Sequence, residues 1–324
     1  MIDSNTLFPI LTLMFSLSII FVTSNGFVKT AIQIAHVWHV PVLYIGTFLI
    51  GLSTSLPEII VTTIASVDGA IDLSIGNILG SCIFNIGFII SITAFIKPLS
   101  ISTETLGKAM PALALSTILT SLLLMIDNQF SATDGIILLG LSVILLILCA
   151  QYIQKNPKRF TSKQIQPLPN HPQWQPWAWF LLYLSGLLWG CELFVNAAIK
   201  IATLLHINEL VIGLTIVALG TSIPELAASI TAAYHNEDDI AIGNIIGSNI
   251  FCLLCILPIP LILAPPQRIV PDQLWISLGT MLGITILLWL FSAKFDKTCK
   301  INRMEASILL LISIAYLVNT CMQN

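Results

Sequence analysis

Charged residues are scarce in this sequence. Lys and Arg number 13 and Asp and Glu 16 among 324 residues, so charges make up 9% of the chain, whereas 56% is hydrophobic. A typical soluble domain carries about a quarter of its residues as charges. At a mean hydropathy of +0.94, the composition predicts an integral membrane protein with the lipid bilayer as its surroundings. The net charge of −3 gives no reason to expect a nucleic-acid partner.

Paired thiol and histidine motifs are also lacking. The seven cysteines lie mostly within apolar runs, and even the Cys252-x-x-Cys255 spacing falls in a hydrophobic segment, so we interpret them as packing residues. We find no zinc-type His motif, no catalytic Asp pair and no Ser with a suitable base. These absences argue against an intramembrane protease, and we expect neither enzymatic activity nor a resident cofactor. Nothing in the chain implies an obligate protein partner.

Long apolar runs dominate what is present. A membrane-spanning helix needs about 20 mostly apolar residues. Ten such runs occur, bounded by charge, Pro or Asn and Asp clusters: 6–35, 42–67, 71–96, 105–126, 132–153, 177–205, 209–234, 239–264, 272–292 and 304–322. The sequence therefore predicts an all-α membrane protein with ten transmembrane helices.

One connection is longer than the rest. Residues 154–176 are rich in Pro, Gln and Lys, and they divide the chain into two five-helix halves, 1–153 and 177–324. Eleven of the 13 basic residues lie on the same side as this linker when the loops are assigned alternately to the two sides. Because positive residues favour the cytoplasmic side, we expect a cytoplasmic linker and both termini outside. The expected location is the cell membrane, or the inner membrane in a Gram-negative bacterium.

The two halves contain the same sequence motif. At an offset of 167 residues, GLSTSLPE (51–58) aligns with ALGTSIPE (218–225), and DLSIGNILGSCIF (72–84) aligns with DIAIGNIIGSNIF (239–251). Between 44–85 and 211–252, 17 of 42 positions are identical. Each half has an odd number of predicted spans, so the second copy should enter the bilayer upside down. Such inverted repeats are typical of secondary transporters, whose substrate site lies near the membrane midplane.

Two acids fall deep within predicted spans. Glu58 and Glu225 occupy matched positions in the second and seventh spans. A carboxylate at that depth is costly and indicates a functional site, and no Lys or Arg lies at a comparable depth to pair with it. Both glutamates are therefore candidate ion ligands.

The residues just before each glutamate add oxygen atoms. Thr54 and Thr221 precede the glutamates by four residues, which places hydroxyl and carboxylate on one helical face. Pro57 and Pro224 interrupt the helical hydrogen bonding, and backbone carbonyls freed within a membrane need protein, water or an ion as partner. The sequence predicts a broken helix at each glutamate.

The third and eighth spans should form the opposite wall of the site. Each carries a polar stripe at i, i+4 and i+8: Asn77, Ser81 and Asn85 in the first half, and Asn244, Ser248 and Cys252 in the second. The spacings Gly76-xxx-Gly80 and Gly243-xxx-Gly247 allow close helix approach. Together the two walls offer a hard, oxygen-rich set of ligands that suits calcium and not zinc or copper. Two carboxylates would neutralise one divalent ion or monovalent ions in turn, which favours exchange over a passive cation channel.

These motifs resemble the paired alpha repeats of the calcium/cation antiporters, of the bacterial sodium/calcium exchanger type. The resemblance covers nearly the whole chain and implies calcium movement driven by sodium through alternating access. It implies that Glu58 and Glu225 are the principal calcium ligands. It also implies that hydroxyls and backbone carbonyls line the calcium and sodium sites, at Thr54, Ser55, Thr221, Ser222, Ser81, Ser248, Gly51 and Ala218. Asn85, in the i+4 position after the first GS serine, completes the candidate ligand set.

The sequence departs from the family pattern at a few positions. The family usually has Asn or Asp at both i+4 positions, whereas the second copy here has Cys252, which removes an oxygen ligand. Cys82 replaces the common Asn after the first GS pair. The alternative function is therefore a calcium or other divalent cation antiporter coupled to protons. Outside the site, we expect the acidic turn of Glu237, Asp238 and Asp239 to be solvated.

Overall fold

The computed structural model describes residues 4–38, 40–69, 71–126, 131–155, 174–204, 218–263, 271–293 and 300–323. Nearly all of these residues are helical. The strands in the described part of the chain are β1 (Leu99–Ser100) and β2 (Lys300–Ile301), which pair antiparallel with Leu99 opposite Ile301. The linker prediction, 154–176, falls largely outside the described residues.

The helices of the first half begin with one long element and end with two, and shorter helices lie between them. They are α1 (Ser4–Trp38), α2 (Val42–Tyr44), η1 (Ile45–Ile50), α3 (Gly51–Thr54), α4 (Leu56–Val67), α5 (Ile71–Phe84), η2 (Asn85–Ile89), α6 (Ile90–Ile96), η3 (Thr105–Ala109), α7 (Met110–Ile126) and α8 (Ala132–Lys155). The η elements are π-helical turns.

The second half follows the same order where it is described. Its helices are α9 (Gln175–Leu204), α11 (Ala218–Thr221), α12 (Ile223–Tyr234), α13 (Asp238–Phe251), η6 (Cys252–Ile256), α14 (Pro258–Leu263), α15 (Pro271–Ser292) and α16 (Arg303–Gln323). The bounds of α11, α12, α13 and η6 equal those of α3, α4, α5 and η2 displaced by 167 residues. The sequence repeat is therefore matched by a repeat of local structure.

The apolar helices agree with the predicted spans. Within the described residues, eight helices are long and apolar enough to cross a membrane, and nine if the bent pair Val42–Thr54 and Leu56–Val67 counts as one span. Of the remaining predicted span, 209–234, the structure describes α11 and α12. The residues 209–217 lie outside its described part.

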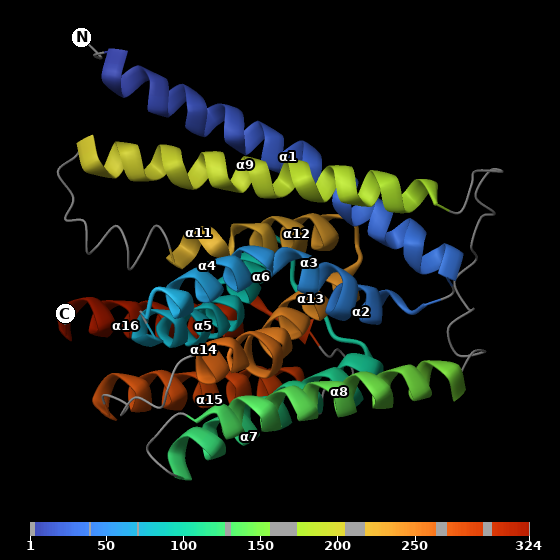
Figure 1. Ribbon diagram of the computed structural model, residues 1–324. Helices are drawn as coiled ribbons and strands as arrows, with labels where there is room; N and C mark the ends of the chain where they lie inside the picture. The colour runs from blue at the N-terminus through green and yellow to red at the C-terminus, as the bar shows by residue number, and fades with distance from the viewer. Residues whose placement is uncertain are drawn as a thin grey trace.

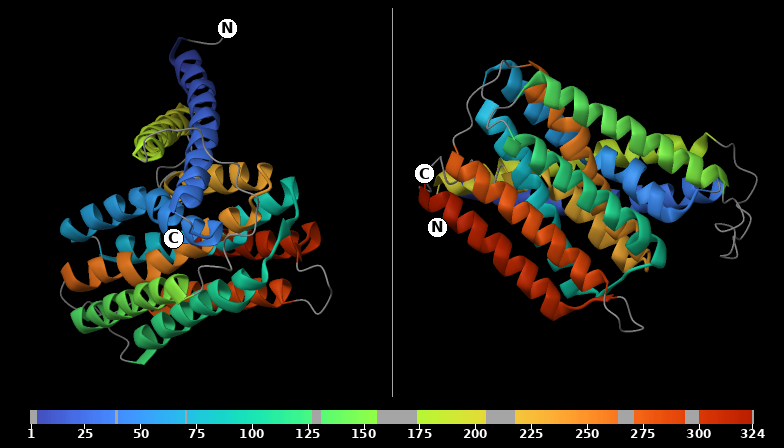
Figure 2. Two further views of the ribbon diagram at one scale, coloured as in Figure 1. Left: turned by 90° about the vertical axis from the view of Figure 1, so that its right-hand side faces the viewer. Right: turned by 90° about the horizontal axis from the view of Figure 1, so that it is seen from below.

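The helices are arranged in layers. Figure 1 shows α1 and α9 crossing each other along one face, next to α11 and α12, and Figure 2 shows this pair on an outer side of the molecule. α1 and α9 pack mainly against each other. The central layer holds α4, α5, α12 and α13, and α7, α8 and α15 lie on the opposite face (Figure 1).

The core of the protein is in the central layer. Over their most apolar stretches, 78% of the residues of Leu73–Ile96 and 83% of those of Asp238–Leu263 are buried, against 22% for α1 and α8. The two GSxIF segments thus form the innermost helices, whereas the outer helices present apolar side chains to their surroundings.

Close backbone contact joins the halves at the crossing of η1 with α13. A side chain at Gly46 would lie 2.8 Å from the carbonyl oxygen of Ile240, and one at Gly243 would lie 2.7 Å from that of Leu43. Gly247 faces the backbone of Thr47 in the same way. The second small-xxx-small motif is therefore used for packing, as its spacing predicts.

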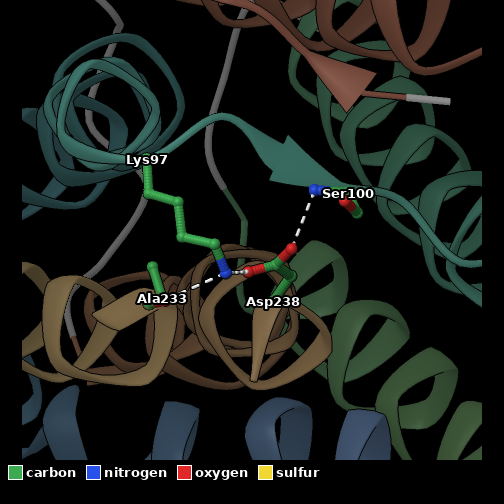
Figure 3. Close-up of polar contacts among 4 residues, drawn as sticks. All are labelled: Lys97, Ser100, Ala233 and Asp238. Carbon is green, nitrogen blue, oxygen red and sulfur yellow. Dashed lines mark hydrogen bonds and ion pairs between the residues drawn. The ribbon is translucent and has the colours of Figure 1, made fainter. Parts of the chain in front are cut away.

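An ion pair holds the start of α13. Lys97 Nζ lies 2.7 Å from Asp238 Oδ1 and donates to the carbonyl oxygen of Ala233 at 3.1 Å, and the Ser100 amide donates to Asp238 Oδ2 at 3.1 Å (Figure 3). Thr105 Oγ1 donates to Asp239 Oδ1 at 3.1 Å. The expectation that this acidic turn is simply solvated is wrong for Asp238 and Asp239. Their partners come from a segment more than a hundred residues away, which local sequence does not reveal.

The glycine crossing leads to a stability prediction. We expect Gly247→Ala to destabilise the protein by about 1–3 kcal/mol, the usual cost of adding a methyl group to a packed interior, because the added carbon meets the Thr47 backbone. The control is Gly279→Ala in α15, where a side chain would meet no described atom within 4 Å. Thermal unfolding of both variants in detergent tests this, and equal melting temperatures would contradict the packing role of Gly247.

Candidate cation site

Each glutamate lies at the start of a helix that follows a break. Ser55 separates α3 from α4, the two segments are bent by 43°, and Glu58 is in the first turn of α4. Ser222 separates α11 from α12 in the same way, and Glu225 is in the first turn of α12. Pro57 and Pro224 lie in the first turns of α4 and α12, where a missing amide hydrogen is tolerated. A helix N-terminus favours a nearby negative charge, so the break predicted from sequence places both carboxylates favourably.

The two halves exchange hydrogen bonds at these carboxylates. Ser222 Oγ donates to Glu58 Oε1 at 3.2 Å, and Ser55 Oγ donates to Glu225 Oε1 at 3.2 Å. Glu58 is 1% exposed and Glu225 is 0% exposed. Each acid is therefore held by the serine that precedes the other acid.

The polar stripe of α13 contacts the same region. Thr54 Oγ1 donates to Asn244 Oδ1 at 3.1 Å, and Asn244 Nδ2 donates to the backbone oxygen of Glu225 at 3.1 Å and to Ser229 Oγ at 2.9 Å. In the first half, Asn77 makes the matching contact, donating to Thr62 Oγ1 at 3.4 Å. The asparagines of both stripes thus tie the third and eighth helices to the glutamate-bearing ones.

The backbone carbonyl of Gly51 lies within this cluster. It accepts a hydrogen bond from Ser248 Oγ at 3.2 Å and lies 2.8 Å from Ser55 Oγ, whose one hydroxyl proton is shared between this carbonyl and Glu225 Oε1. Gly51 and Ser248, both candidate ligands from the sequence, are therefore in direct contact. Ala218, the matched residue, is the first residue of α11.

Four buried oxygen atoms near these elements have no hydrogen-bond partner in the described part of the chain. They are Glu58 Oε2, Glu225 Oε2, Ser81 Oγ and Asn85 Oδ1. Buried polar atoms are almost always hydrogen-bonded, so unpaired oxygens on residues from both halves call for a ligand. The ion pair formed by the described residues is that of Lys97 with Asp238, so no cationic side chain among them neutralises either glutamate.

The donor set has the chemistry of a hard-cation site. Carboxylate, hydroxyl, amide and carbonyl oxygens are the ligands that calcium prefers. Across the described residues, no group of three or more His, Cys, Asp or Glu side chains is placed to hold a metal ion, which separates this site from the thiolate and imidazole sites typical of zinc. The site could hold a cation through the unpaired oxygens and through lone pairs already partly used by the serines.

Thr221 and Cys252, also singled out from the sequence, are buried in the second half. Thr221 is 7% exposed and lies in α11. Cys252 is fully buried, begins the π-helical turn η6, and makes a side-chain contact with Cys82. Sequence reasoning missed Asn249, which is buried and hydrogen-bonded to Asn85. The sequence did contain a signal for Asn249, because the matched residue in the first half is Cys82 and the two copies therefore differ at this position.

The glutamates are enclosed in this structure. A cavity of about 270 Å³ lies elsewhere, between η1, η3 and α8, and Phe48, Lys108 and Tyr152 are among its lining residues. None of the candidate ligands lines it. Glu58 and Glu225 are thus closed off from solvent in this conformation.

The chain is similar in sequence and in structure to known antiporters and sodium/calcium exchangers. A family model described as sodium/calcium exchanger protein matches residues 8–151 and 175–322. The putative antiporter CaxA of Alkalimonas amylolytica is 37% identical over 299 residues, which cover 91% of this chain and 92% of that protein. The sodium/calcium exchanger MaX1 of Methanosarcina acetivorans is 27% identical over 331 residues, with 91% and 93% covered. A solved structure of the sodium-calcium exchanger NCX_Mj superposes with a TM-score of 0.80 at 31% identity, covering 97% of this chain and 99% of that one.

The geometry predicts cation-dependent stabilisation. A ligand that binds only the folded state stabilises it by about 2.7 kcal/mol at 100 times its dissociation constant. We expect calcium to raise the melting temperature of the purified protein, and Glu58→Gln to remove most of that rise because it removes one of the two charges. Glu192→Gln is the control, since Glu192 lies on α9 with an exposed side chain. A full calcium response in Glu58→Gln would contradict the site.

Proposed function

Because the chain belongs to the sodium/calcium exchanger family, and thus to the multi-pass membrane transporters, we propose that it exchanges calcium for sodium by alternating access. The site lies at the glutamates, near the membrane midplane. The observation that carries the proposal is the reciprocal pair of serine–glutamate hydrogen bonds beside four unpaired buried oxygens. The names of the relatives point to calcium and sodium as the transported ions.

Charge balance explains why a cation belongs there. Two ionised carboxylates buried without a counter-charge are strongly disfavoured in a low-dielectric interior. One calcium ion neutralises both, and sodium ions do so in turn. An empty, doubly charged site is unfavourable in the enclosed conformation, so the protein crosses between its two open states loaded. This requirement favours coupled exchange over a channel.

We assign the ligand roles by residue. Glu58 and Glu225 contribute one free oxygen each as the main calcium ligands. The hydroxyls and carbonyls of Thr54, Ser55, Thr221, Ser222, Ser81, Ser248, Gly51 and Ala218, with the amide oxygen of Asn85, complete the calcium and sodium positions. The hydrogen bonds that link Ser55, Ser222, Thr54 and Ser248 to one cluster support this assignment.

Two features of the fold support alternating access, namely the internal repeat and the outer layer of α1 and α9. We propose ten transmembrane helices in two inverted repeats, 1–153 and 177–324, with alpha motifs at 44–85 and 211–252. The matched bounds of the central helices support this. The moving part is the layer of α1 and α9, because these helices pack mainly against each other and touch the rest through α12, η1 and α11. Their displacement opens the glutamates to one side or the other.

The orientation is part of the same proposal. We place the linker 154–176 in the cytoplasm and both termini outside, in the cell membrane. The distribution of Lys and Arg supports this, since eleven of 13 lie on the side of the linker.

Transport in liposomes tests the proposal. We expect radioactive calcium to enter proteoliposomes when sodium is loaded inside, and uptake to fall to background in Glu58→Gln and Glu225→Gln, because each removes one of the two charges that bind calcium. Glu192→Gln is the matched control and should transport normally.

A second experiment, with a proton gradient in place of the sodium gradient, identifies the driving ion. Uptake driven only by an outward proton gradient without sodium would overturn the sodium assignment in favour of a proton-coupled divalent cation antiporter, for which the thiol at Cys252 in the i+4 position is the motivating observation. Flux that continues without any counter-ion would instead indicate a channel.

A further inference from the structure

The two copies of the motif exchange an asparagine and a cysteine. The first copy reads GSCIFN, with Cys82 and Asn85, and the second reads GSNIFC, with Asn249 and Cys252. Under the offset of 167 residues, Cys82 matches Asn249 and Asn85 matches Cys252. Each copy therefore has one amide and one thiol at these two positions, in opposite order.

The structure brings these four residues together in matched pairs. Asn85 Nδ2 donates to Asn249 Oδ1 at 3.0 Å. The repeat-related pair, Cys252 and Cys82, is also in side-chain contact. All four side chains are 1% exposed or less. The amide pair is hydrogen-bonded and the thiol pair lies close together, at the place where the innermost helices of the two halves meet.

A backbone carbonyl fixes which way the amides point. Asn249 Nδ2 donates to the carbonyl oxygen of Cys82 at 3.2 Å. A backbone carbonyl can only accept, so the amide group of Asn249 has to face it with its nitrogen. Its oxygen then faces Asn85, so Asn85 has to donate a hydrogen bond to it from the side-chain nitrogen.

The result is that Asn85 Oδ1 is turned away from Asn249. That oxygen is buried and has no hydrogen-bond partner in the described part of the chain. Ser81, one helical turn earlier, has an unpaired buried oxygen as well. A flipped Asn85 would present an amide nitrogen in the same place, and hydrogen atoms bearing partial positive charge repel a cation.

We propose that Asn249 is a positioning residue that holds Asn85 Oδ1 toward the transported cation. This inference rests on the proposed function. The Cys82 carbonyl orients the Asn249 amide, and the Asn249 amide, on the other half, in turn orients the amide of Asn85. It matters here because the matched position, Cys252, has a thiol, so Asn85 supplies the amide oxygen at this level of the site.

A double-mutant cycle tests the relay. Calcium and sodium dissociation constants are measured by calorimetry on the purified full-length protein for Asn249→Ala, Asn85→Ala and the double variant. We expect Asn249→Ala to weaken cation binding by about tenfold, within the usual range for residues that orient metal ligands. Because Asn249 acts through Asn85, the double variant should bind no more weakly than Asn85→Ala alone.

Matched variants separate positioning from folding. Cys82→Ala keeps the backbone carbonyl and should bind cations within about twofold of wild type. Asn249→Leu, similar in size and without hydrogen-bonding atoms, makes the same test should the alanine variant not fold. Melting temperatures without cations report any general loss of stability, which by itself does not change the cycle.

Two outcomes would overturn the proposal. One is an Asn249 variant that binds calcium and sodium as wild type does. The other is a double variant whose loss equals the product of the two single losses, which would mean that Asn249 acts independently of Asn85. A wild-type protein that binds cations without transporting them overturns only the proposed function, because the relay is read from binding.

Discussion

The central constraint on this protein is the burial of two carboxylates that have no cationic side chain beside them among the described residues. Glu58 and Glu225 each use one oxygen to accept a serine hydroxyl from the other half and keep the second oxygen free. Hydroxyl donors and helix N-termini reduce the cost of the charge but do not remove it. The proposed cation would complete this interior, so that binding and stability would have the same physical origin.

The backbone features of the core serve that arrangement. The breaks at Ser55 and Ser222 turn two helix starts toward the centre. The glycines at the crossing of η1 with α13 let the main chains approach, so that the Gly51 carbonyl reaches Ser248. Lys97 then holds the start of α13 through Asp238 (Figure 3). Side chains larger than hydrogen at this crossing would hold α13 away from the glutamates.

Much of this could be predicted from the sequence because the repeat supplies two independent copies of each signal. The broken helices, the pair of glutamates and the polar stripes follow from residues that recur at an offset of 167, and shared apolar composition does not produce matching Pro, Glu and Asn. The contacts between the two halves could not be predicted from the repeated motif. The bond from Thr54 to Asn244, the pairing of Lys97 with Asp238 and the relay through Asn249 join residues that are far apart in sequence. Only the packing of the two halves decides them.

The exchanged serine bonds also bear on how such a chain can evolve. The serine that donates to each carboxylate is encoded in the other half. A half-length ancestor with one glutamate and one serine would have formed these two bonds only by pairing with a second copy of itself. Once the copies are fused, a change at Ser55 is felt at Glu225 and not at Glu58. The two serines are therefore tied to the acid of the opposite half, while 25 of the 42 compared positions, the Asn and Cys pairs among them, differ between the halves.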